Sequence, residues 1–236
     1  MSGGKKKQKS ESRVDFRPLL KGGCERLGIE LEKAAVDRLF IYYEELKRWS
    51  RKINLIAKES TDEQIIENHF LDSLTLLPLL TDCGQVHLLD VGTGAGFPGL
   101  VCKTARPGIT LTLVEPRLKR VSFLRHIART LQLDDVSVLA CRIEDEELLP
   151  SAVPFTHITS RAVTDVGAFL DLVGRFAPSE PVIICMKGPK WQQELAVIAD
   201  KIQTGSVGLV KTVQLCLPFS GAERCLLVLK ILAKLA

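Results

Sequence analysis

The first third of the chain has the periodicity of helices. Between residues 15 and 49 apolar side chains recur every three or four positions, and residues 60–80 repeat this spacing. The recurring positions of the first stretch are Ala35, Leu39, Tyr42, Tyr43, Leu46 and Trp49. Thr61 followed by Gln64 resembles the capping pair that opens a helix. The pattern therefore predicts an N-terminal helical extension over residues 14–82.

From residue 86 onward, short apolar runs alternate with amphipathic stretches. The runs that predict strands cover residues 86–92, 109–116, 136–145, 155–163, 181–188, 206–217 and 223–232. The stretches that predict helices cover residues 97–105, 117–133, 166–176 and 191–202, with a short acidic helix after the third strand. This alternation gives a parallel sheet with helices on both faces, and the last two strands, with no helix between them, form an antiparallel hairpin. We predict a doubly wound, seven-stranded, mostly parallel α/β domain over residues 83–236.

The turn after the first predicted strand is the strongest local signal. Asp90 ends the strand, Gly92, Gly94 and Gly96 follow, and a helix begins near Phe97. Glycine permits positive φ and lets a ligand approach the backbone closely. A helix N-terminus offers unpaired N–H groups to a polar or anionic group. A tight strand-to-helix connection that binds nothing is the alternative.

The spacing of this turn distinguishes two cofactors. A dinucleotide site needs G-x-G-x-x-G, and its third glycine would fall on Phe97. An S-adenosylmethionine site holds no phosphate: the loop wraps the methionine end, an acidic residue precedes the glycines and an apolar residue touches the adenosine. Asp90 and Phe97 match the second arrangement. We therefore expect S-adenosylmethionine as cofactor and S-adenosylhomocysteine as product.

Two later strand ends add candidate contacts to the same ligand. Glu115 follows the second strand, where a carboxylate can accept both ribose hydroxyls of a nucleotide-like ligand. Ile143 and Glu144 follow the third strand, where adenine would need an apolar face and a polar edge. For Glu144, an acidic residue favoured by the dipole of a following helix is an equal alternative.

The end of the fourth predicted strand limits the reaction. The chain has no Asn/Asp-Pro-Pro-aromatic motif, which holds the exocyclic amine of adenine or cytosine, and no cysteine beside a proline, which would attack the cytosine ring. Guanine N7 needs neither, because its in-plane lone pair can attack a sulfonium methyl without losing a proton. We expect Arg161 and Lys187 to orient the substrate, neither acting as a general base. A salt bridge between Arg161 and Asp165 is the structural alternative.

Charge and cysteines describe the setting. Residues 1–13 hold five basic residues and one acidic residue, which accounts for the formal charge of +4, and they predict a disordered basic tail. The tail is compatible with a polyanionic partner, although solubility alone would also explain it. Seven cysteines without a C-x-x-C pair, no signal peptide and no long apolar run indicate a cytoplasmic protein with reduced thiols, no metal site and no membrane contact.

Five segments, taken together, resemble one family. They are HFLDSL at 69–74, LLDVGTGAGFPGL at 88–100, ITSRAV at 158–163, MKG at 186–188 and ERCLLVLK at 223–230. In this combination the chain resembles the bacterial small-subunit rRNA methyltransferase G family, also called glucose-inhibited division protein B, over residues 38–230. The resemblance implies a class I, Rossmann-like fold and methylation of N7 of the guanine at position 527 of 16S rRNA, with S-adenosylmethionine as donor.

The resemblance also implies roles for individual residues. The implied cofactor contacts are Gly92, Phe97, Glu115, Ile143, Glu144 and Arg161. The candidate substrate-binding residues are His69, Asp72, Ser73, Lys187 and Arg224. Asn54, His69, Asp72 and Ser73 belong to the extension, which folds over the site. From its context alone, His69 is a hydrogen-bonded packing residue, and Asp72 is a cap or the partner of an arginine. Cys225 stands where the family has a histidine after Arg224.

Two basic clusters are candidates for RNA contact. One follows the first helical stretch and the other follows the second strand: Arg48, Arg51 and Lys52, and Arg117, Lys119, Arg120, Arg125 and Arg129. Such groups bind phosphates without sequence preference, although solvated helix faces have the same composition. The expected partner is 16S rRNA or the 30S subunit, bound by a monomer.

Three other functions remain open from the residues. The same core could methylate another RNA site or a small molecule. A NAD-dependent dehydrogenase is disfavoured by Phe97 and by the lack of a later His–Arg or Tyr–Lys constellation. A non-catalytic RNA-binding module is disfavoured by the intact set of Asp90, loop glycines and Glu115.

Overall fold

The computed structural model describes residues 15–80, 84–161 and 164–232, so the predicted basic tail of residues 1–13 lies outside the described residues. At its centre is a seven-stranded sheet in the order β3-β2-β1-β4-β5-β7-β6. β1 to β5 pair in parallel, and β7 runs antiparallel to both β5 and β6. The strands are β1 (His87–Val91), β2 (Thr110–Val114), β3 (Val136–Leu139), β4 (His157–Arg161), β5 (Val182–Lys187), β6 (Val207–Cys216) and β7 (Glu223–Ile231).

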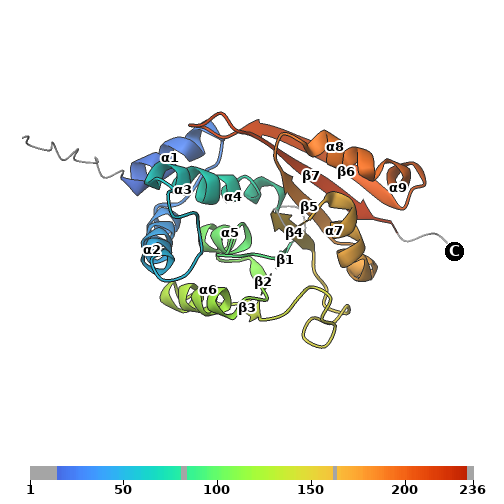
Figure 1. The fold of residues 1–236 in the computed structure, drawn as a ribbon, viewed down its shortest axis with the longest axis horizontal. Coiled ribbons are helices and arrows are strands. Elements are labelled where there is room, and N and C mark those ends of the chain that lie inside the picture. The colour runs from blue at the N-terminus through green and yellow to red at the C-terminus, as the bar shows by residue number, and fades with distance from the viewer. Residues whose placement is uncertain (1–14, 81–83, 162–163, 233–236) are drawn as a thin grey trace, which may run out of the picture.

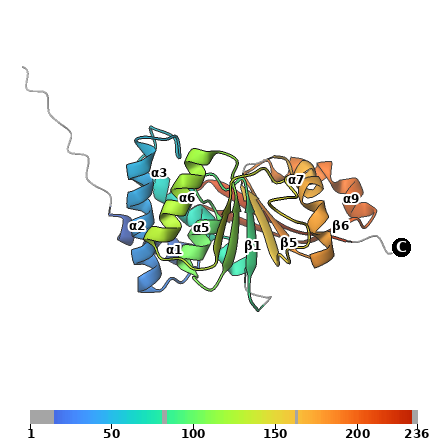
Figure 2. The same cartoon turned by 90° about the horizontal axis from the view of Figure 1, so that it is seen from below.

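Helices cover both faces of this sheet (Figure 2). One face carries α5 (Gly99–Ala105) and α6 (Leu118–Thr130); the other carries α7 (Val166–Val173), the 3₁₀ helix η3 (Gly174–Ser179), α8 (Trp191–Val197) and α9 (Ala199–Gln203). Successive side chains of a strand point to opposite faces. Leu88 accordingly lies in the buried cluster of the first face, and Leu89 lies in that of the second. These layers confirm the predicted doubly wound fold.

The N-terminal segment is helical, as predicted, and lies over the side of α5 (Figure 1). Its elements are α1 (Phe16–Arg26), α2 (Lys33–Ser50), α3 (Asp62–Ile65), the π-helix η1 (Ile66–Leu71), α4 (Asp72–Leu74) and the 3₁₀ helix η2 (Leu77–Leu79). One buried cluster joins Leu39 and Phe70 of this extension to Leu100 and Phe123 of the sheet domain. The predicted boundary between residues 82 and 83 falls within residues 81–83, outside the described residues.

A second attachment ties the extension to the far edge of the sheet. Glu67 of η1 is buried, and its Oε1 accepts hydrogen bonds from the N–H groups of Phe219 and Ser220, at 2.6 and 2.9 Å. Arg26 of α1 donates to the carbonyl of Pro218 at 2.8 Å. These residues form the turn between β6 and β7, so the hairpin and the extension hold each other in place.

Two stretches predicted to be helical, residues 15–49 and 191–202, are each interrupted. Residues 15–49 contain a turn after α1, where Gly28 has a φ of +67° and the Ile29 N–H bonds the Cys24 carbonyl. This left-handed glycine ends α1 because the following backbone closes on its last turn. Residues 191–202 are interrupted at Ile198, between α8 and α9.

Other boundaries differ around the binding loops. β3 ends at Leu139. The prediction of a short acidic helix after it is wrong, because residues 140–156 form turns and irregular backbone. Asp145 accepts a hydrogen bond from the Leu148 N–H, a local bond that favours a turn. α5 begins at Gly99 instead of Phe97, because the glycine turn continues as far as Pro98.

The described cysteines are free thiols. Five of them are buried, as predicted for core-filling residues, whereas Cys216 is exposed on the edge strand β6: the buried ones are Cys24, Cys102, Cys141, Cys185 and Cys225. Within the described part of the chain, each helix is too short or too polar to cross a membrane.

Candidate active site

The loop between β1 and α5 is built around the buried carboxylate of Asp90. Its Oδ2 accepts hydrogen bonds from Thr93 Oγ1 at 2.6 Å and from the Gly99 N–H at 2.8 Å. A Cβ at position 99 would lie 2.8 Å from the same oxygen, so only glycine lets the helix start come this close. The three predicted loop glycines have positive φ: they are Gly92, Gly94 and Gly96.

The other oxygen of Asp90 bears on what the loop can bind. Burial raises the pKa of Asp90 to about 6, against the opposing hydrogen bonds from Thr93 and Gly99. Oδ1 has no hydrogen-bond partner among the described residues. Leaving a buried carboxylate oxygen unpaired is unfavourable. A donor such as the ammonium group of S-adenosylmethionine would satisfy it, so this loop fits the amino-acid end of that cofactor.

Glu115 follows β2 and faces the same loop. It is buried, with Oε2 accepting from the Gly94 N–H and Oε1 from the Arg117 N–H, each at 3.0 Å. The guanidinium of Arg120 lies 3.6 Å from Oε2. Because each carboxylate oxygen has two lone pairs, these bonds leave capacity for the ribose hydroxyls of the predicted contact.

Phe97 lies beneath the extension. Its ring is 4% exposed and runs nearly parallel to those of Tyr42 and His69, with centroid distances of 6.0 and 4.8 Å. The guanidinium of Arg161 lies 5.1 Å from the centroid of the Phe97 ring. The residue predicted to touch adenosine therefore links the cofactor loop to the extension and to β4.

Ile143 and Glu144 lie in the turn after β3. Ile143 is buried, and its carbonyl accepts a hydrogen bond from Arg175 at 2.6 Å, whereas Glu144 is exposed. Because no helix begins in residues 140–156, the helix-dipole explanation of Glu144 is wrong. The adenine contact of both residues stays a prediction.

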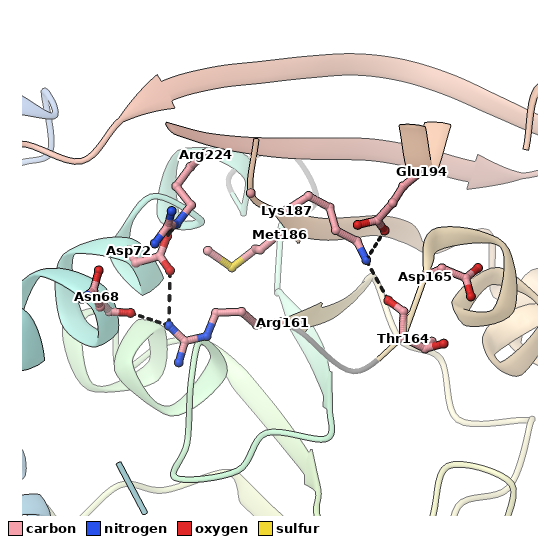
Figure 3. A pocket seen from close by; sticks show the side chains of 10 residues that line it. Asn68, Asp72, Arg161, Thr164, Asp165, Met186, Lys187, Glu194 and Arg224 are labelled. Carbon is pink, nitrogen blue, oxygen red and sulfur yellow. Dashed lines mark hydrogen bonds and ion pairs between the residues drawn. The ribbon is translucent and has the colours of Figure 1, made fainter. Parts of the chain in front are cut away.

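A cavity of about 690 Å³ lies at the carboxyl ends of β4 and β5 (Figure 3), a size suited to a nucleobase with part of its backbone. Its charged lining is balanced, with three basic and three acidic side chains. The lining residues are Asn68, Asp72, Arg161, Thr164, Asp165, Met186, Lys187, Gly188, Glu194 and Arg224. Four residues predicted to bind or orient the substrate thus come together from distant segments: Asp72, Arg161, Lys187 and Arg224.

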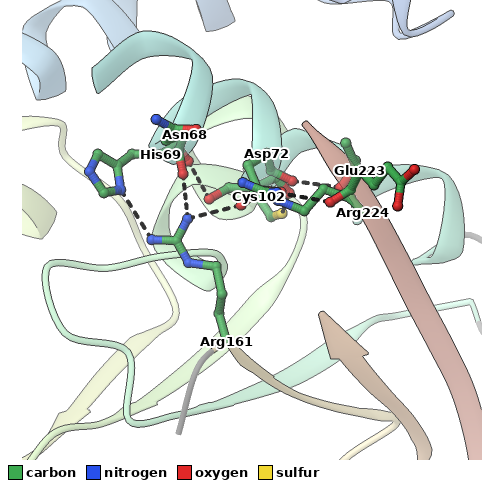
Figure 4. Close-up of polar contacts among 9 residues, drawn as sticks. Asn68, His69, Asp72, Cys102, Arg161, Glu223 and Arg224 are labelled. Atoms are coloured by element: carbon green, nitrogen blue, oxygen red, sulfur yellow. Dashed lines mark hydrogen bonds and ion pairs between the residues drawn. The ribbon is translucent and has the colours of Figure 1, made fainter. Parts of the chain in front are cut away.

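Asp72 holds two arginines at once (Figure 4). Its Oδ2 lies 3.3 Å from Arg161 of β4, and its Oδ1 accepts from Arg224 of β7 at 3.1 Å. Arg161 also donates to the Asn68 carbonyl at 2.6 Å. The structure thus confirms the interpretation of Asp72 as the partner of an arginine. The alternative salt bridge of Arg161 with Asp165 is wrong, because Asp165 caps α7 and Arg161 pairs with Asp72.

Lys187 lies at the end of β5, on the opposite side of the cavity. It is 8% exposed, and its Nζ lies 2.6 Å from Glu194 of α8 and 2.7 Å from the carbonyl of Thr164. A buried ammonium group needs such partners. They hold Lys187 at the cavity wall as a fixed positive charge.

His69 and Ser73 support the helix. Burial, together with the charge of Arg161, lowers the pKa of His69 to about 3, and its Nδ1 faces Nη2 of Arg161 at 3.2 Å. A neutral imidazole that accepts from arginine is a hydrogen-bonded packing residue. Ser73 is fully buried and donates to the His69 carbonyl, so this conformation does not support the predicted substrate contact of Ser73. Asn54 is exposed.

Three contacts of the site were not predicted from the sequence. Tyr42 donates to the carbonyl of Ala95 in the cofactor loop, Asn68 accepts from Arg161, and Glu194 pairs with Lys187. A buried tyrosine hydroxyl usually has a hydrogen-bond partner, so the helical spacing that buries Tyr42 was a signal that its hydroxyl is bonded. For Asn68 the contact uses a backbone carbonyl, and the residue type gives no signal of it.

Comparison with known proteins identifies the family. The model of the family "rRNA small subunit methyltransferase G" matches residues 35–219. A relative of that name from Desulfotalea psychrophila is 52% identical over 216 residues, covering 92% of this chain and 99% of the relative. A second, from Syntrophotalea carbinolica, is 40% identical over 205 residues, covering 87% and 93%.

Solved structures support the fold. An O-methyltransferase from Bacillus cereus in complex with S-adenosylhomocysteine matches with a TM-score of 0.58 at 14% identity, covering 92% of this chain and all of that one. Cofactor-bound Rv0187 from MTB matches with a TM-score of 0.57 at 15% identity, covering 83% and 89%. The family model, the relatives and the fold show that the chain belongs to the rRNA small subunit methyltransferase G family and is a class I S-adenosylmethionine-dependent methyltransferase.

Proposed function

We propose that this enzyme methylates N7 of a guanine in the 16S rRNA of the small ribosomal subunit. The proposal rests on the family and on one observation, the cavity at the carboxyl ends of β4 and β5. Its described lining contains no cysteine and no histidine, and each of its three cations has a partner. Its carboxylates are engaged as well: Asp72 and Glu194 pair with these cations, and Asp165 accepts from the Ala168 N–H at the start of α7. Such a cavity can hold a base and orient it, and it is not arranged for proton transfer or nucleophilic attack.

The reaction balances without either group. S-adenosylmethionine supplies the methyl group when bound. The lone pair of N7 forms the new N–C bond, and the electrons of the S–C bond remain on sulfur, leaving S-adenosylhomocysteine. No proton leaves the base, and the purine ring becomes cationic. The enzyme's residues therefore have to align two reactants and accommodate a positive product.

The charges of the cavity suit this product. Asp72 pairs with both Arg161 and Arg224, and Glu194 pairs with Lys187. With Asp165 as the third acidic side chain, the formal charges of the wall cancel, so it does not repel a cationic purine. Arg161 can still donate toward guanine O6 or a phosphate, since a guanidinium has five N–H groups. His69, with its pKa lowered to about 3, is a weak base at neutral pH. The proposal thus assigns orientation to Arg161 and Lys187 and proton transfer to neither.

An exposed basic surface supports RNA as the substrate. No acidic residue occurs between Glu115 and Asp134, and four basic side chains of this stretch are exposed: Arg117, Lys119, Arg125 and Arg129. The stretch begins at the carboxyl end of β2, and the cavity lies at the carboxyl ends of β4 and β5, so both are at the same end of the parallel strands. Trp49 of α2 packs against Phe123 of α6, which brings exposed Arg51 and Lys52 close to the same surface.

Mass spectrometry of rRNA tests the proposal. Subunits from cells that lack this methyltransferase are incubated with the enzyme and S-adenosylmethionine, and nuclease fragments are analysed. We expect one 7-methylguanosine, within the fragment that contains position 527, and little product from free GMP. A methyl group on another atom or base would contradict the assignment, as would equal turnover of free nucleotide.

The pH dependence of kcat tests the absence of a general base. Between about pH 7 and 9 we expect kcat to change little, because N7 has no proton to lose. A steep rise with pH that disappears on replacing one ionisable side chain would contradict this mechanism.

We further propose that the enzyme acts as a monomer in the cytoplasm, on the 30S subunit or its rRNA. The names of its relatives support the small subunit as the partner. Light scattering of the purified enzyme tests the monomer, and a stable dimer at working concentration would contradict it.

A further inference from the structure

The cofactor loop has a contact that comes from outside the sheet domain. The hydroxyl of Tyr42, on α2 of the extension, donates a hydrogen bond to the carbonyl of Ala95. Ala95 lies between the loop glycines Gly94 and Gly96, at the middle of the turn. The contact joins residues 53 positions apart, and both partners are buried.

Packing reinforces this single bond. The ring of Tyr42 runs parallel to that of Phe97 within 6°, at a centroid distance of 6.0 Å. A Cβ at Gly96 would overlap the Tyr42 hydroxyl, so the loop lies directly against this side chain. Burial raises the pKa of Tyr42 well above its usual range, and the nearby carboxylate of Asp90 raises it further, so the hydroxyl remains a donor.

Among the described residues, the other hydrogen bonds of the loop come from the sheet domain. Gly92 and Thr93 donate to the Val114 carbonyl, and Gly94 donates to Glu115. These contacts hold the part of the loop that lies nearest β2. Tyr42 holds the Ala95 carbonyl from the other side, where the chain turns toward Phe97.

We propose that Tyr42 is a positioning residue for the methyl donor: the extension fixes the conformation of residues 94–97 through its hydroxyl. The inference rests on the proposed function only in that the same loop binds the donor. Without this bond the loop samples other conformations, and a ligand then binds more weakly because it must order the loop. The extension thus contributes to cofactor affinity as well as covering the substrate cavity.

The chain offers a matched control on the same helix. Its two tyrosines are adjacent, and Tyr43 is also buried, with its ring against Phe16, Phe40 and Phe70. The Tyr43 hydroxyl accepts a hydrogen bond from Lys47 of the same helix at 3.1 Å. Tyr42→Phe and Tyr43→Phe each remove one hydroxyl from a buried ring of α2. Effects on the helix itself should therefore be similar, whereas only the first variant loses the bond to the loop.

Two measurements compare the variants. By calorimetry with S-adenosylhomocysteine, we expect Tyr42→Phe to raise Kd roughly 5- to 10-fold, and Tyr43→Phe to change it less than about twofold. Hydrogen exchange of the cofactor-free protein should show faster exchange in residues 92–97 for Tyr42→Phe alone. Unchanged affinity and unchanged loop exchange in Tyr42→Phe would overturn the proposal, while wild-type methylation of rRNA would leave the proposed function standing.

A third measurement does not need the Tyr42→Phe variant to fold. In Tyr43→Phe, Tyr42 is the sole tyrosine, so incorporation of 3-fluorotyrosine gives one ¹⁹F resonance from that position. We expect this resonance to shift on adding S-adenosylhomocysteine. A resonance that stays in place while calorimetry shows binding would overturn the proposal. If wild-type protein fails to bind S-adenosylhomocysteine, the cofactor assignment fails instead.

Discussion

The carboxylate of Asp72 joins three segments of the chain: the extension, β4 through Arg161 and β7 through Arg224. Its side chain is 5% exposed, and those of Arg161 and Arg224 are 19% and 22% exposed, so the three charges are largely removed from water. Removing one partner of such a group leaves the others buried and unpaired. The residue therefore holds the extension over the cavity and sets the position of both arginines.

Replacing Asp72 with Asn tests this role. We expect the free energy of unfolding to fall by about 2–3 kcal/mol, because two charged hydrogen-bond partners lose their counter-charge. kcat/KM for rRNA should fall at least roughly tenfold as Arg161 loses its orientation. Urea unfolding and methylation assays check both values. Asp37→Asn is the control, because the side chains of Asp37 and its partner Arg17 are 44% and 42% exposed, far more than those around Asp72. Solvent screens this ion pair, so we expect the free energy of unfolding to fall by less than roughly 0.5 kcal/mol.

His69 gives the stability a defined dependence on pH. Its folded pKa of about 3 lies below the ordinary value of 6.5, so below pH 6.5 the unfolded chain binds a proton that the folded protein does not. Stability from the neutral imidazole is therefore complete above pH 6.5 and is lost as pH falls. Between pH 7 and 5, we expect the wild type to lose about 1–2 kcal/mol relative to His69→Gln. If the free energies of unfolding of the two proteins changed equally with pH across this range, the lowered pKa of His69 would be contradicted.

Burial of Asp90 acts in the opposite direction. Its folded pKa of about 6 exceeds the ordinary value of 3.8, so the folded protein binds this proton first, and stability falls as pH rises from about 4 to 6. The total stability curve therefore mixes two opposed trends. For this reason the difference between wild type and His69→Gln is the informative quantity, since Asp90 is common to both.

At the scale of elements, η1 couples the extension to the edge hairpin. The π-helix places Glu67 toward the β6–β7 turn and His69 toward Phe97, so one helical segment serves both sides of the site. π-helical turns are rare and occur often at functional sites. In this protein the wider turn gives neighbouring residues these divergent contacts.

Glu67→Ala tests the attachment of the hairpin. The N–H groups of Phe219 and Ser220 would lose their acceptor, and we expect about 2 kcal/mol of destabilisation with faster hydrogen exchange in residues 217–222. Glu63→Ala is the control, because Glu63 is exposed on the preceding turn of α3. Equal effects of the two variants on hairpin exchange would rule out the proposed attachment.

The alternation of strands and helices and the cofactor loop could be predicted because each depends on local pattern. Alternating runs dictate a parallel sheet, and Asp90, the glycines and Glu115 lie at adjacent strand ends by topology alone. The break at Gly28 and the turns of residues 140–156 depend on single local hydrogen bonds that periodicity does not reveal. The pairing of Asp72 with Arg161 and Arg224 spans up to 152 positions, and only the packed fold shows which carboxylate meets which arginine.

On the scale of the whole molecule, charge is distributed unevenly. The cavity is neutral, with each cation paired, whereas the α6 surface is basic and lacks acidic neighbours in sequence. A neutral pocket suits a cationic purine, and a basic exterior suits the phosphates around it. The chemistry and the binding of RNA are thereby assigned to separate parts of one edge of the molecule.

This separation predicts how binding depends on salt. Replacing Lys119 with Glu should weaken binding to the 30S subunit roughly 3- to 10-fold near physiological salt. The negative slope of log K against log salt should become shallower by about 0.9, since one phosphate contact is lost. S-adenosylhomocysteine should bind as before. Lys211→Glu is the matched control, because Lys211 is also exposed but lies on the edge strand β6. If both variants lower the slope alike, binding follows net charge, and α6 is not the surface that meets the RNA.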